Sequence, residues 1–262
     1  MTAPVPATLI TGASAGIGAA LAFVFADNGH RLVLVARRAA RLHALADRIA
    51  ERGHARPHVM PADLLRADAV ARIGEGLRDH GVEPQFIVNN AGFGLIGTAA
   101  SLDRAEQLAM IDLNVRVLTD FSLSFLENLA RHRGGILNVA STASFMPGPA
   151  MAVYHATKAY VLSFSEALHR ELKPMGVRVT ALCPGPVETE FQARAGIPGG
   201  RFRRVLGRGA DRVARDGYDG LMRNRRVVVP GFSNQVAATL PRLLPRAVLL
   251  SLLCRIQGDH AG

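Results

Sequence analysis

The sequence predicts an α/β fold, a single doubly wound parallel sheet of about seven strands with helices on both faces. Short and almost continuously apolar runs, typical of strands buried on both faces, alternate with longer amphipathic stretches of helical period. No linker rich in proline and serine interrupts this alternation, and no internal repeat is present in the 262 residues. We therefore expect one domain over residues 1–262, whose last part, residues 190–262, forms a substrate loop and a basic, apolar tail.

The elements follow one another in a regular order. The expected strands are Ala7–Thr11, Arg31–Ala36, Pro57–Pro61, Phe86–Asn89, Gly135–Ala140, Val177–Cys183 and Arg226–Val229. The clearest helices between them are Gly16–Asn28, Ala40–Arg52 and Val153–Lys173. Because ligands of open α/β sheets bind beyond the carboxyl ends of the strands, the loops that follow these strands are where we expect the site.

The first strand leads into a glycine-rich loop, Thr11-Gly12-Ala13-Ser14-Ala15-Gly16-Ile17-Gly18, and then into a helix. Glycines allow a tight turn and a close approach of backbone N–H groups to a phosphate, and the helix N-terminus attracts the same anion. The loop therefore indicates a dinucleotide pyrophosphate site, although its spacing is G-x-x-x-G-x-G and an ordinary glycine-rich turn is the alternative. Its residues are Gly12, Ser14, Ala15, Gly16, Ile17 and Gly18.

A second glycine run, Gly92-Phe93-Gly94-Leu95-Ile96-Gly97, matches the G-x-G-x-x-G pattern literally and also follows a strand. The acid twenty residues further on, Asp112, falls in a helical stretch, and no strand intervenes to bring it to a ribose. A dinucleotide site needs strand, loop, helix and strand in succession. We therefore reject this run as the pyrophosphate site.

The end of the second strand indicates which cofactor is bound. An NAD(H) enzyme usually carries an acid there, which holds the ribose 2′-hydroxyl. This chain has Arg37 and Arg38 instead, and a guanidinium pairs well with a 2′-phosphate that a carboxylate would repel. We expect NADP(H), with NAD(H) the less favoured alternative.

A Tyr-x-x-x-Lys pair, Tyr154 and Lys158, places both side chains on one face of a helix. Alone this pair is typical of a solvated helix surface. Ser141, thirteen residues upstream at the end of a strand, and Asn114 in an earlier helix give it weight. With the first glycine loop and Asn89-Asn90-Ala91-Gly92, the set resembles the short-chain dehydrogenase/reductase family in type, order and spacing. The resemblance runs from about Thr8 to Thr189.

The resemblance implies hydride transfer between the nicotinamide and a carbonyl or secondary alcohol. Tyr154 would be the general acid in reduction and the base in oxidation, with its pKa lowered by Lys158 and by the oxidised nicotinamide. Lys158 would also hold the nicotinamide ribose, and Ser141 would hydrogen-bond the substrate oxygen. Asn114 would anchor a water that links Lys158 to solvent; a buried structural amide is the alternative. We read the neighbouring His155 as a helix-surface residue without a role.

The same resemblance implies further cofactor contacts. Asp63, with Leu64, would meet the adenine, although Asp63 is also explained as a helix cap. Asn90 would lie at the adenosine ribose. The remaining expected contacts are Ala91, Gly92, Pro184, Gly185, Val187 and Thr189. Of these, Thr189 and the backbone around Pro184 and Val187 would face the nicotinamide carboxamide.

The last third of the chain is basic: 13 arginines and 5 acids follow from Glu190 onward, against a net charge of +10 for the whole chain. Compositional drift is the favoured explanation of this basic charge. The functional alternative is an acyl-carrier or phosphate-bearing substrate, or a membrane face. Within it, residues 197–209 are Gly- and Arg-rich and suggest a substrate lid. Residues 236–256 suggest a weak peripheral membrane contact, with packing on the domain or another subunit as the alternative.

Composition excludes other classes. The histidines show no ligand spacing, which argues against a metal site, and aromatic residues are not interleaved with the basic ones, which argues against nucleic acid. Cys183 and Cys254 are not paired in spacing, and Met1–Thr8 lacks a secretion signal, so we expect a cytoplasmic protein. The substrate is expected to be a small carbonyl or alcohol, lipophilic or acyl-like, and the protein a homodimer or homotetramer. A silent NADP(H)-binding regulator and a nucleotide-sugar epimerase are the alternatives.

Overall fold

The structure, a computed structural model, describes residues 4–187, 190, 209–242 and 244–257. Seven parallel strands form one sheet in the order β3-β2-β1-β4-β5-β6-β7, which confirms the expected fold class. The strands are β1 (Val5–Thr11), β2 (Leu32–Ala36), β3 (His58–Pro61), β4 (Val82–Asn89), β5 (Gly135–Val139), β6 (Arg178–Leu182) and β7 (Val227–Val228). The strand order reverses between β1 and β4, the position at which doubly wound sheets bind ligands.

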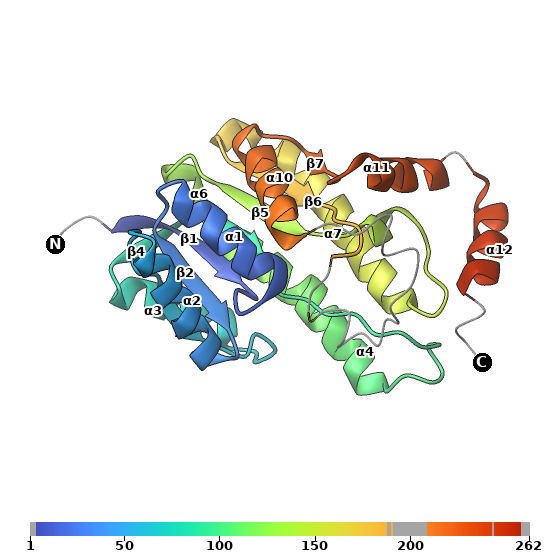
Figure 1. Cartoon of the computed structure of the whole chain (residues 1–262), viewed down its shortest axis with the longest axis horizontal. Helices are drawn as coiled ribbons and strands as arrows, with labels where there is room; N and C mark the ends of the chain where they lie inside the picture. The colour runs from blue at the N-terminus through green and yellow to red at the C-terminus, as the bar shows by residue number, and fades with distance from the viewer. Residues whose placement is uncertain (1–3, 188–189, 191–208, 243, 258–262) are drawn as a thin grey trace.

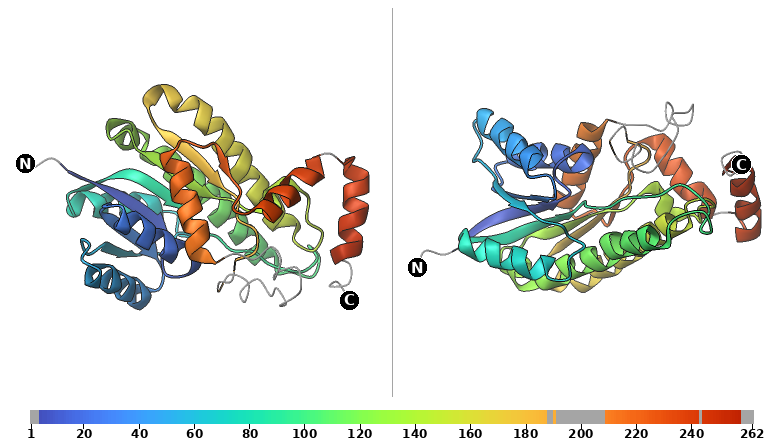
Figure 2. Two further views of the ribbon diagram at one scale, coloured as in Figure 1. Left: turned by 45° about the horizontal axis from the view of Figure 1, so that its top comes forward. Right: turned by 90° about the horizontal axis from the view of Figure 1, so that it is seen from below.

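Helices cover both faces of the sheet (Figures 1 and 2). One face carries α1 (Gly16–Asp27), α2 (Ala39–Glu51) and α10 (Ala210–Met222). The other carries α3 (Ala69–Asp79), α5 (Leu118–Ser124), α6 (Leu126–Arg131) and α7 (Ala152–Glu171). The other described helices are α4 (Arg104–Ile111), the π-helix η1 (Asp112–Val117), the 3₁₀ turns η2 (Thr142–Phe145), η3 (Lys173–Met175) and η4 (Leu240–Arg242), α11 (Phe232–Thr239) and α12 (Arg246–Gln257).

Alternate residues of the central strands face opposite layers. Ile10 and Leu34 pack against α1 and α2, whereas Leu9 and Val33 pack against the layer of α3 and α7. All four side chains are fully buried, and burial of one such side chain stabilises the fold by about 1.5–3 kcal/mol. The continuously apolar strands of the sequence are therefore explained by a core on each side of the sheet.

The observed elements differ from the predicted ones mainly at their ends. Strand β4 begins at Val82, four residues before the predicted start at Phe86. The prediction starts too late because Glu83 and Pro84 interrupt the apolar pattern of the strand. The register between β1 and β4 shifts between Ala7 and Thr8. Ala7 is paired with Pro84, and the proline has no backbone N–H to donate to the ladder. Strand β7 is reduced to Val227–Val228 at the sheet edge.

A buried polar network ties the middle of the sheet to α7. Asn89 donates through Nδ2 to Asn138 Oδ1 at 2.8 Å, and Asn138 Nδ2 donates to Ser165 Oγ at 2.9 Å. Ser165 lies on α7 and donates in turn to the carbonyl of Val161. Because buried polar groups are costly unless they are paired, this network fixes α7 against β5 at one relative position.

Candidate active site

The predicted site residues meet at the carboxyl edge of the sheet. Ser141 lies two residues beyond the end of β5, Tyr154 and Lys158 lie on the first turns of α7, and Asn114 lies on η1. Asn114, Lys158 and Tyr154 are buried, at 1%, 6% and 8% exposure. The glycine loop between β1 and α1 ends at the same edge. The structure therefore brings together side chains that lie far apart in the sequence.

Tyr154 and Ser141 are hydrogen-bonded to each other. Ser141 Oγ also accepts from the backbone N–H of Ala143 at 3.1 Å, which fixes the rotamer of the serine at the start of η2. Burial raises the pKa of the Tyr154 phenol to about 12, and the hydrogen bond with Ser141 acts in the opposite direction. Desolvation is the largest effect in the protein without its cofactor, and the lowering expected from Lys158 and the oxidised nicotinamide stays a prediction for the complex.

Lys158 is held by the backbone of β5. Its Nζ donates to the carbonyl of Val139 at 2.8 Å and lies 5.9 Å from the centroid of the Tyr154 ring. Burial lowers the pKa of Lys158 to about 8, while the nearby Cys183 acts in the opposite direction. At neutral pH the lysine is thus mostly protonated, and its pKa is only about one unit above that pH.

Asn114 occupies the only π-helical stretch of the described residues, and such bulges often occur at functional sites. Its Oδ1 accepts from the N–H of Phe93 at 3.1 Å, and its Nδ2 donates to the carbonyl of Phe93 at 2.9 Å and to Thr157 Oγ1 at 3.1 Å. The side chain therefore clamps the loop after β4 to α7. Both readings of Asn114, structural amide and site residue, are compatible with this position between Phe93 and the turn of Lys158.

The glycine loop is packed as closely as a phosphate cradle requires. Gly12 has φ +66°, and a Cβ on Gly18 would come within 2.5 Å of both Asn90 Nδ2 and the carbonyl of Gly12. Asn90 Nδ2 donates to the carbonyls of Thr11 and Gly12 at 2.9 and 3.2 Å. Asn90 thus holds the loop, and its contact with the adenosine ribose stays a prediction. Ala15 precedes α1, so the helix N-terminus faces the loop as expected.

Arg38 is joined to the glycine loop and to an acid from a distant part of the chain. Its Nε and Nη2 donate to Ser14 Oγ at 3.3 and 3.0 Å, and its Nη1 donates to Glu190 at 2.6 Å. Arg41, one turn into α2, bonds to the other oxygen of the same carboxylate. The two arginines hold the pKa of Glu190 below its ordinary value through these hydrogen bonds. Arg37 is exposed beside them.

The other predicted cofactor residues line the same edge. Asp63 Oδ1 accepts from the N–H of Leu65 at 3.1 Å and so caps the turn after β3, while Leu64 is buried. Gly92 faces Asn114, with Ala91 beside it. After β6, the carbonyl of Pro184 accepts from Thr142, Gly185 lies against Asn234, and Val187 is buried. Thr189 and residues 197–208 of the expected lid lie outside the described residues.

Several residues that shape the site were not predicted. Thr11 Oγ1 accepts from the N–H groups of Asn90 and Ala91, both at 3.1 Å, and Ser144 Oγ donates to the carbonyl of Lys158 at 2.7 Å. His155, read as a surface residue, is buried instead and bonds to the carbonyl of Met146 at 2.9 Å. The turn that starts at Thr142 packs against this side of α7. The helical period of the sequence does not predict this contact.

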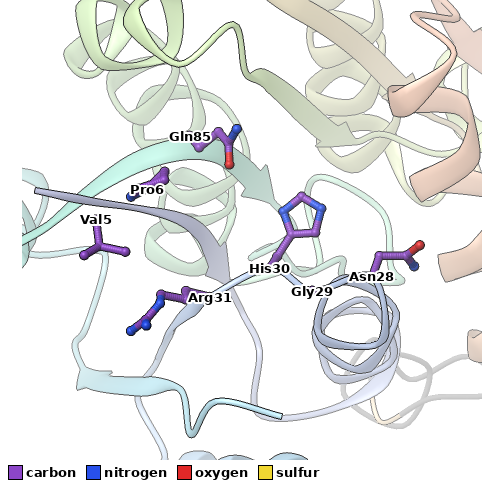
Figure 3. A pocket seen from close by; sticks show the side chains of 7 residues that line it. All are labelled: Val5, Pro6, Asn28, Gly29, His30, Arg31 and Gln85. Carbon is purple, nitrogen blue, oxygen red and sulfur yellow. The ribbon is translucent and has the colours of Figure 1, made fainter.

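The surroundings of Tyr154 are apolar. Phe93, Met110 and Tyr154 form one buried cluster, which the half-buried side chains of Leu95, Leu113, Met151 and Val153 extend. A second depression lies on the other edge of the sheet, at the start of β1 and the turn before β2 (Figure 3). His30, Arg31 and Gln85 line it. Because it faces the amino ends of the strands, it is separate from the site described above.

Comparison with known proteins agrees with this arrangement. A family model described as short chain dehydrogenase matches residues 6–197. Sulfoacetaldehyde reductase 2 of Chromohalobacter salexigens is 38% identical over 186 residues, which cover 70% of this chain and 73% of that protein. An NADP-dependent 3-hydroxy acid dehydrogenase of Salmonella typhi is 36% identical over 190 residues, covering 71% and 74%.

Among solved structures, a short-chain dehydrogenase from Sphingobium yanoikuyae in complex with NADPH superposes with a TM-score of 0.78. It is 33% identical, and the match covers 93% of this chain and 98% of that one. Fold, site and comparisons together define an oxidoreductase that acts on alcohol or carbonyl groups. The chain belongs to the short-chain dehydrogenase family.

Proposed function

We propose that this protein is an NADP(H)-dependent carbonyl reductase, with Tyr154, Ser141, Lys158 and Asn114 as its active-site residues. The observation that carries the proposal is the buried Tyr154 phenol, hydrogen-bonded to Ser141 and held close to Lys158 at the carboxyl edge of the sheet. A pKa of about 12 keeps this phenol protonated at neutral pH. A protonated phenol beside a carbonyl oxygen can act as the general acid of a reduction.

The cofactor, when bound, supplies the hydride at its nicotinamide ring. Ser141 donates a hydrogen bond to the substrate oxygen as negative charge develops there, and Tyr154 transfers its phenolic proton to that oxygen. Lys158, mostly protonated at pH 7, stabilises the tyrosinate that this transfer leaves. Asn114 keeps the loop at Gly92 and Phe93 in place and so positions Lys158.

The glycine loop fits a dinucleotide, because the missing side chains of Gly12 and Gly18 let the loop close against Asn90 beside the N-terminus of α1. Arg38 favours a cofactor with a 2′-phosphate, since it lies at the end of β2 and is oriented by Ser14. Support also comes from the relatives named above, one described as NADP-dependent and one solved with NADPH.

The apolar cluster around Tyr154 favours a lipophilic carbonyl compound over a strongly charged one. The test of the proposed reaction is the consumption of NADPH absorbance with a panel of aldehydes and ketones of graded hydrophobicity. We expect turnover that increases with the apolar size of the carbonyl substituents. Turnover confined to charged carbonyl compounds would contradict the substrate class, although the reaction type would stand.

A silent cofactor-binding regulator would bind NADPH tightly and consume none of it with any carbonyl compound. A nucleotide-sugar epimerase would consume no net cofactor and would interconvert sugar epimers instead. The intact set of Asn114, Ser141, Tyr154 and Lys158 favours the reductase over the regulator. The same absorbance assay, with sugar epimers as a second readout, distinguishes the three functions.

We also propose a peripheral membrane contact through the C-terminal helices. Helix α11 buries Asn234 and Ala238 and turns Phe232 and Val236 outward, at 78% and 47% exposure. Leu240, at the start of the adjoining turn η4, is 54% exposed. On α12, Val248 and Leu250 are exposed as well. An outward apolar face on a helix is unusual in water and is typical of a helix that lies on a membrane surface.

Charge supports an anionic lipid surface as the partner of these helices. From the start of α11 to the end of α12, residues 232–257 contain three arginines and no acid. A second copy of this segment would bring like charges together, whereas an anionic headgroup layer would neutralise them. None of the described helices is long and apolar enough to cross a membrane. Both helices lie at the end of the molecule opposite the N-terminus, where a flat surface can approach them (Figure 1).

Cys254 offers a direct test of this contact, because it is exposed on α12 whereas Cys183 is buried. An environment-sensitive fluorophore on Cys254 should brighten with vesicles that contain phosphatidylserine and should not respond to pure phosphatidylcholine. Replacement of Phe232 by Ser should reduce the response. An unchanged emission with both vesicle types would contradict the proposal, as would a self-association that buries the probe without lipid.

We propose a homo-oligomer built on α4, α5 and α7. Leu108, Leu123 and Tyr160 are all more than a third exposed on these helices, and light scattering on the purified protein would give the assembly size. We also propose a cytoplasmic, reducing compartment, because Cys183 and Cys254 lie far apart in the sequence without paired spacing.

A further inference from the structure

The carboxylate of Glu190 lies where the proposed function places the cofactor's 2′-phosphate. It is bound to Arg38 and Arg41, and Arg38 is bound in turn to Ser14 of the glycine loop. Glu190 comes from the chain beyond β6, some 150 residues after the two arginines. No acid directly follows β2 in the sequence, and the fold brings one to that place from a distant part of the chain.

We propose that Glu190 is an internal counter-ion that competes with the 2′-phosphate for Arg38 and Arg41, and that it thereby limits the preference for NADP(H) over NAD(H). A carboxylate and a phosphate seek the same guanidinium donors and repel each other, so both cannot occupy the arginine pair. A bound 2′-phosphate must displace Glu190, and the free energy of the lost ion pairs is subtracted from its binding. NAD(H), which has no phosphate there, does not bear this cost.

Local charges support a competition of moderate size. About half of the surface of each side chain, Arg38, Arg41 and Glu190, is open to solvent, so the pair is screened and exchangeable. The hydrogen bonds from both arginines keep the pKa of Glu190 below its ordinary value, and the competitor is therefore ionised at neutral pH. Without Glu190, two guanidinium groups would face the phosphate with no acid between them.

The inference rests on the proposed NADP(H) specificity, and the test separates the two. The probes are 2′,5′-ADP, which carries the extra phosphate, and 5′-AMP, which does not; the measurement is the Kd of each by titration calorimetry at low salt. For Glu190→Gln we expect 2′,5′-ADP to bind about two- to fivefold more tightly and 5′-AMP to bind as before, the range typical of exposed ion pairs.

Asp47→Asn is the matched control, since Asp47 is an exposed carboxylate on the same helix α2, paired with Arg56. It changes the net charge equally and should leave both Kd values unchanged. A Glu190→Gln protein that binds 2′,5′-ADP no more tightly than the unaltered protein would overturn the inference, and weaker binding would make Glu190 a support for Arg38 instead. If the inference about Glu190 fails in either way but the unaltered protein still binds 2′,5′-ADP more tightly than 5′-AMP, the proposed preference for NADP(H) is retained. If neither protein distinguishes the two nucleotides, both proposals fail.

Discussion

Gly92 and Asn114 lie so close together that no side chain fits between them. A Cβ on Gly92 would come within 2.8 Å of Asn114 Oδ1 and 3.5 Å of Lys158 Nζ. The absence of a side chain at position 92 is thus what allows the loop after β4 to reach η1 and α7. The glycine run that starts at Gly92 matches a phosphate-binding pattern only in its letters, because no helix follows it until Arg104.

Gly92→Ala should push Asn114 and Lys158 apart while leaving the fold intact. We expect kcat for carbonyl reduction to fall about 10- to 100-fold, as displacements of about an ångström commonly cause. Steady-state kinetics and a thermal melt measure both effects. Gly76→Ala on α3 is the control, since its Cβ would meet only the flexible end of Met60. An unaltered kcat in the Gly92→Ala variant would show that the contact has no bearing on the reaction.

Arg38 and Arg37 should contribute unequally to cofactor choice. Arg38→Met removes the guanidinium that Ser14 orients, and we expect the Kd of NADPH to rise at least tenfold while that of NADH is unaffected, in line with hydrogen bonds to charged groups. Arg37→Met should have a smaller effect, because the structure gives Arg37 no such anchor in the glycine loop. Fluorescence titration of both cofactors would decide; equal losses for the two variants would contradict this ranking.

Lys158 should make the stability of the protein depend on pH. Its pKa in the fold is about 8, below its ordinary value of 10.5, so the unfolded chain binds more protons between these values and stability rises with pH there. The cost of burying the charge is fully present below pH 8. Lys158→Met removes that cost at every pH. Between pH 7 and 9.5 the unaltered protein should therefore gain roughly 2 kcal/mol in the free energy of unfolding that the variant does not gain.

Urea unfolding of both proteins at the two pH values measures this difference. Loss of the bond to Val139 adds an offset that does not change with pH, so only the change between the two values is informative. A difference that stays constant would mean that Lys158 keeps an ordinary pKa.

Asn138→Leu should destabilise the fold, because it leaves the amide of Asn89 and the hydroxyl of Ser165 with fewer partners in the core. We expect a loss of about 2 kcal/mol in the free energy of unfolding. Asn28→Leu, which removes an exposed bond to Val24, should cost less than about 0.5 kcal/mol. Equal effects in urea unfolding would refute a structural role for the buried network.

What the sequence could predict was set by local patterns. The strands, the glycine loop and the spacing of Tyr154 and Lys158 all follow from residues close together in the chain. The structure places Ser141 and Asn114 with them, as the resemblance implied. The N-terminal part of β4 was missed because Pro84 and Glu83 break the apolar run that marks a buried strand.

Features that depend on distant contacts could not be predicted. Glu190 reaches Arg38 across most of the chain, and no spacing rule links the two positions. The helical period places His155 on the solvent side of α7, but the turn at Gly148 packs against the His155 ring and buries it. Periodicity alone therefore predicts the wrong exposure for this residue. The raised pKa of Tyr154 likewise follows from burial, which the sequence alone does not measure.

In the proposed reaction, Tyr154 gives its proton to a carbonyl compound that receives a hydride from NADPH. The most direct measurement uses NADPH deuterated at C4, on the hydride-donating face, with the best carbonyl substrate of the panel and mass spectrometry of the product. We predict one deuterium on the carbinol carbon, formed about 10²–10⁴-fold more slowly by Tyr154→Phe although this variant still binds NADPH. A product without deuterium, or equal rates for the two proteins, would contradict the account.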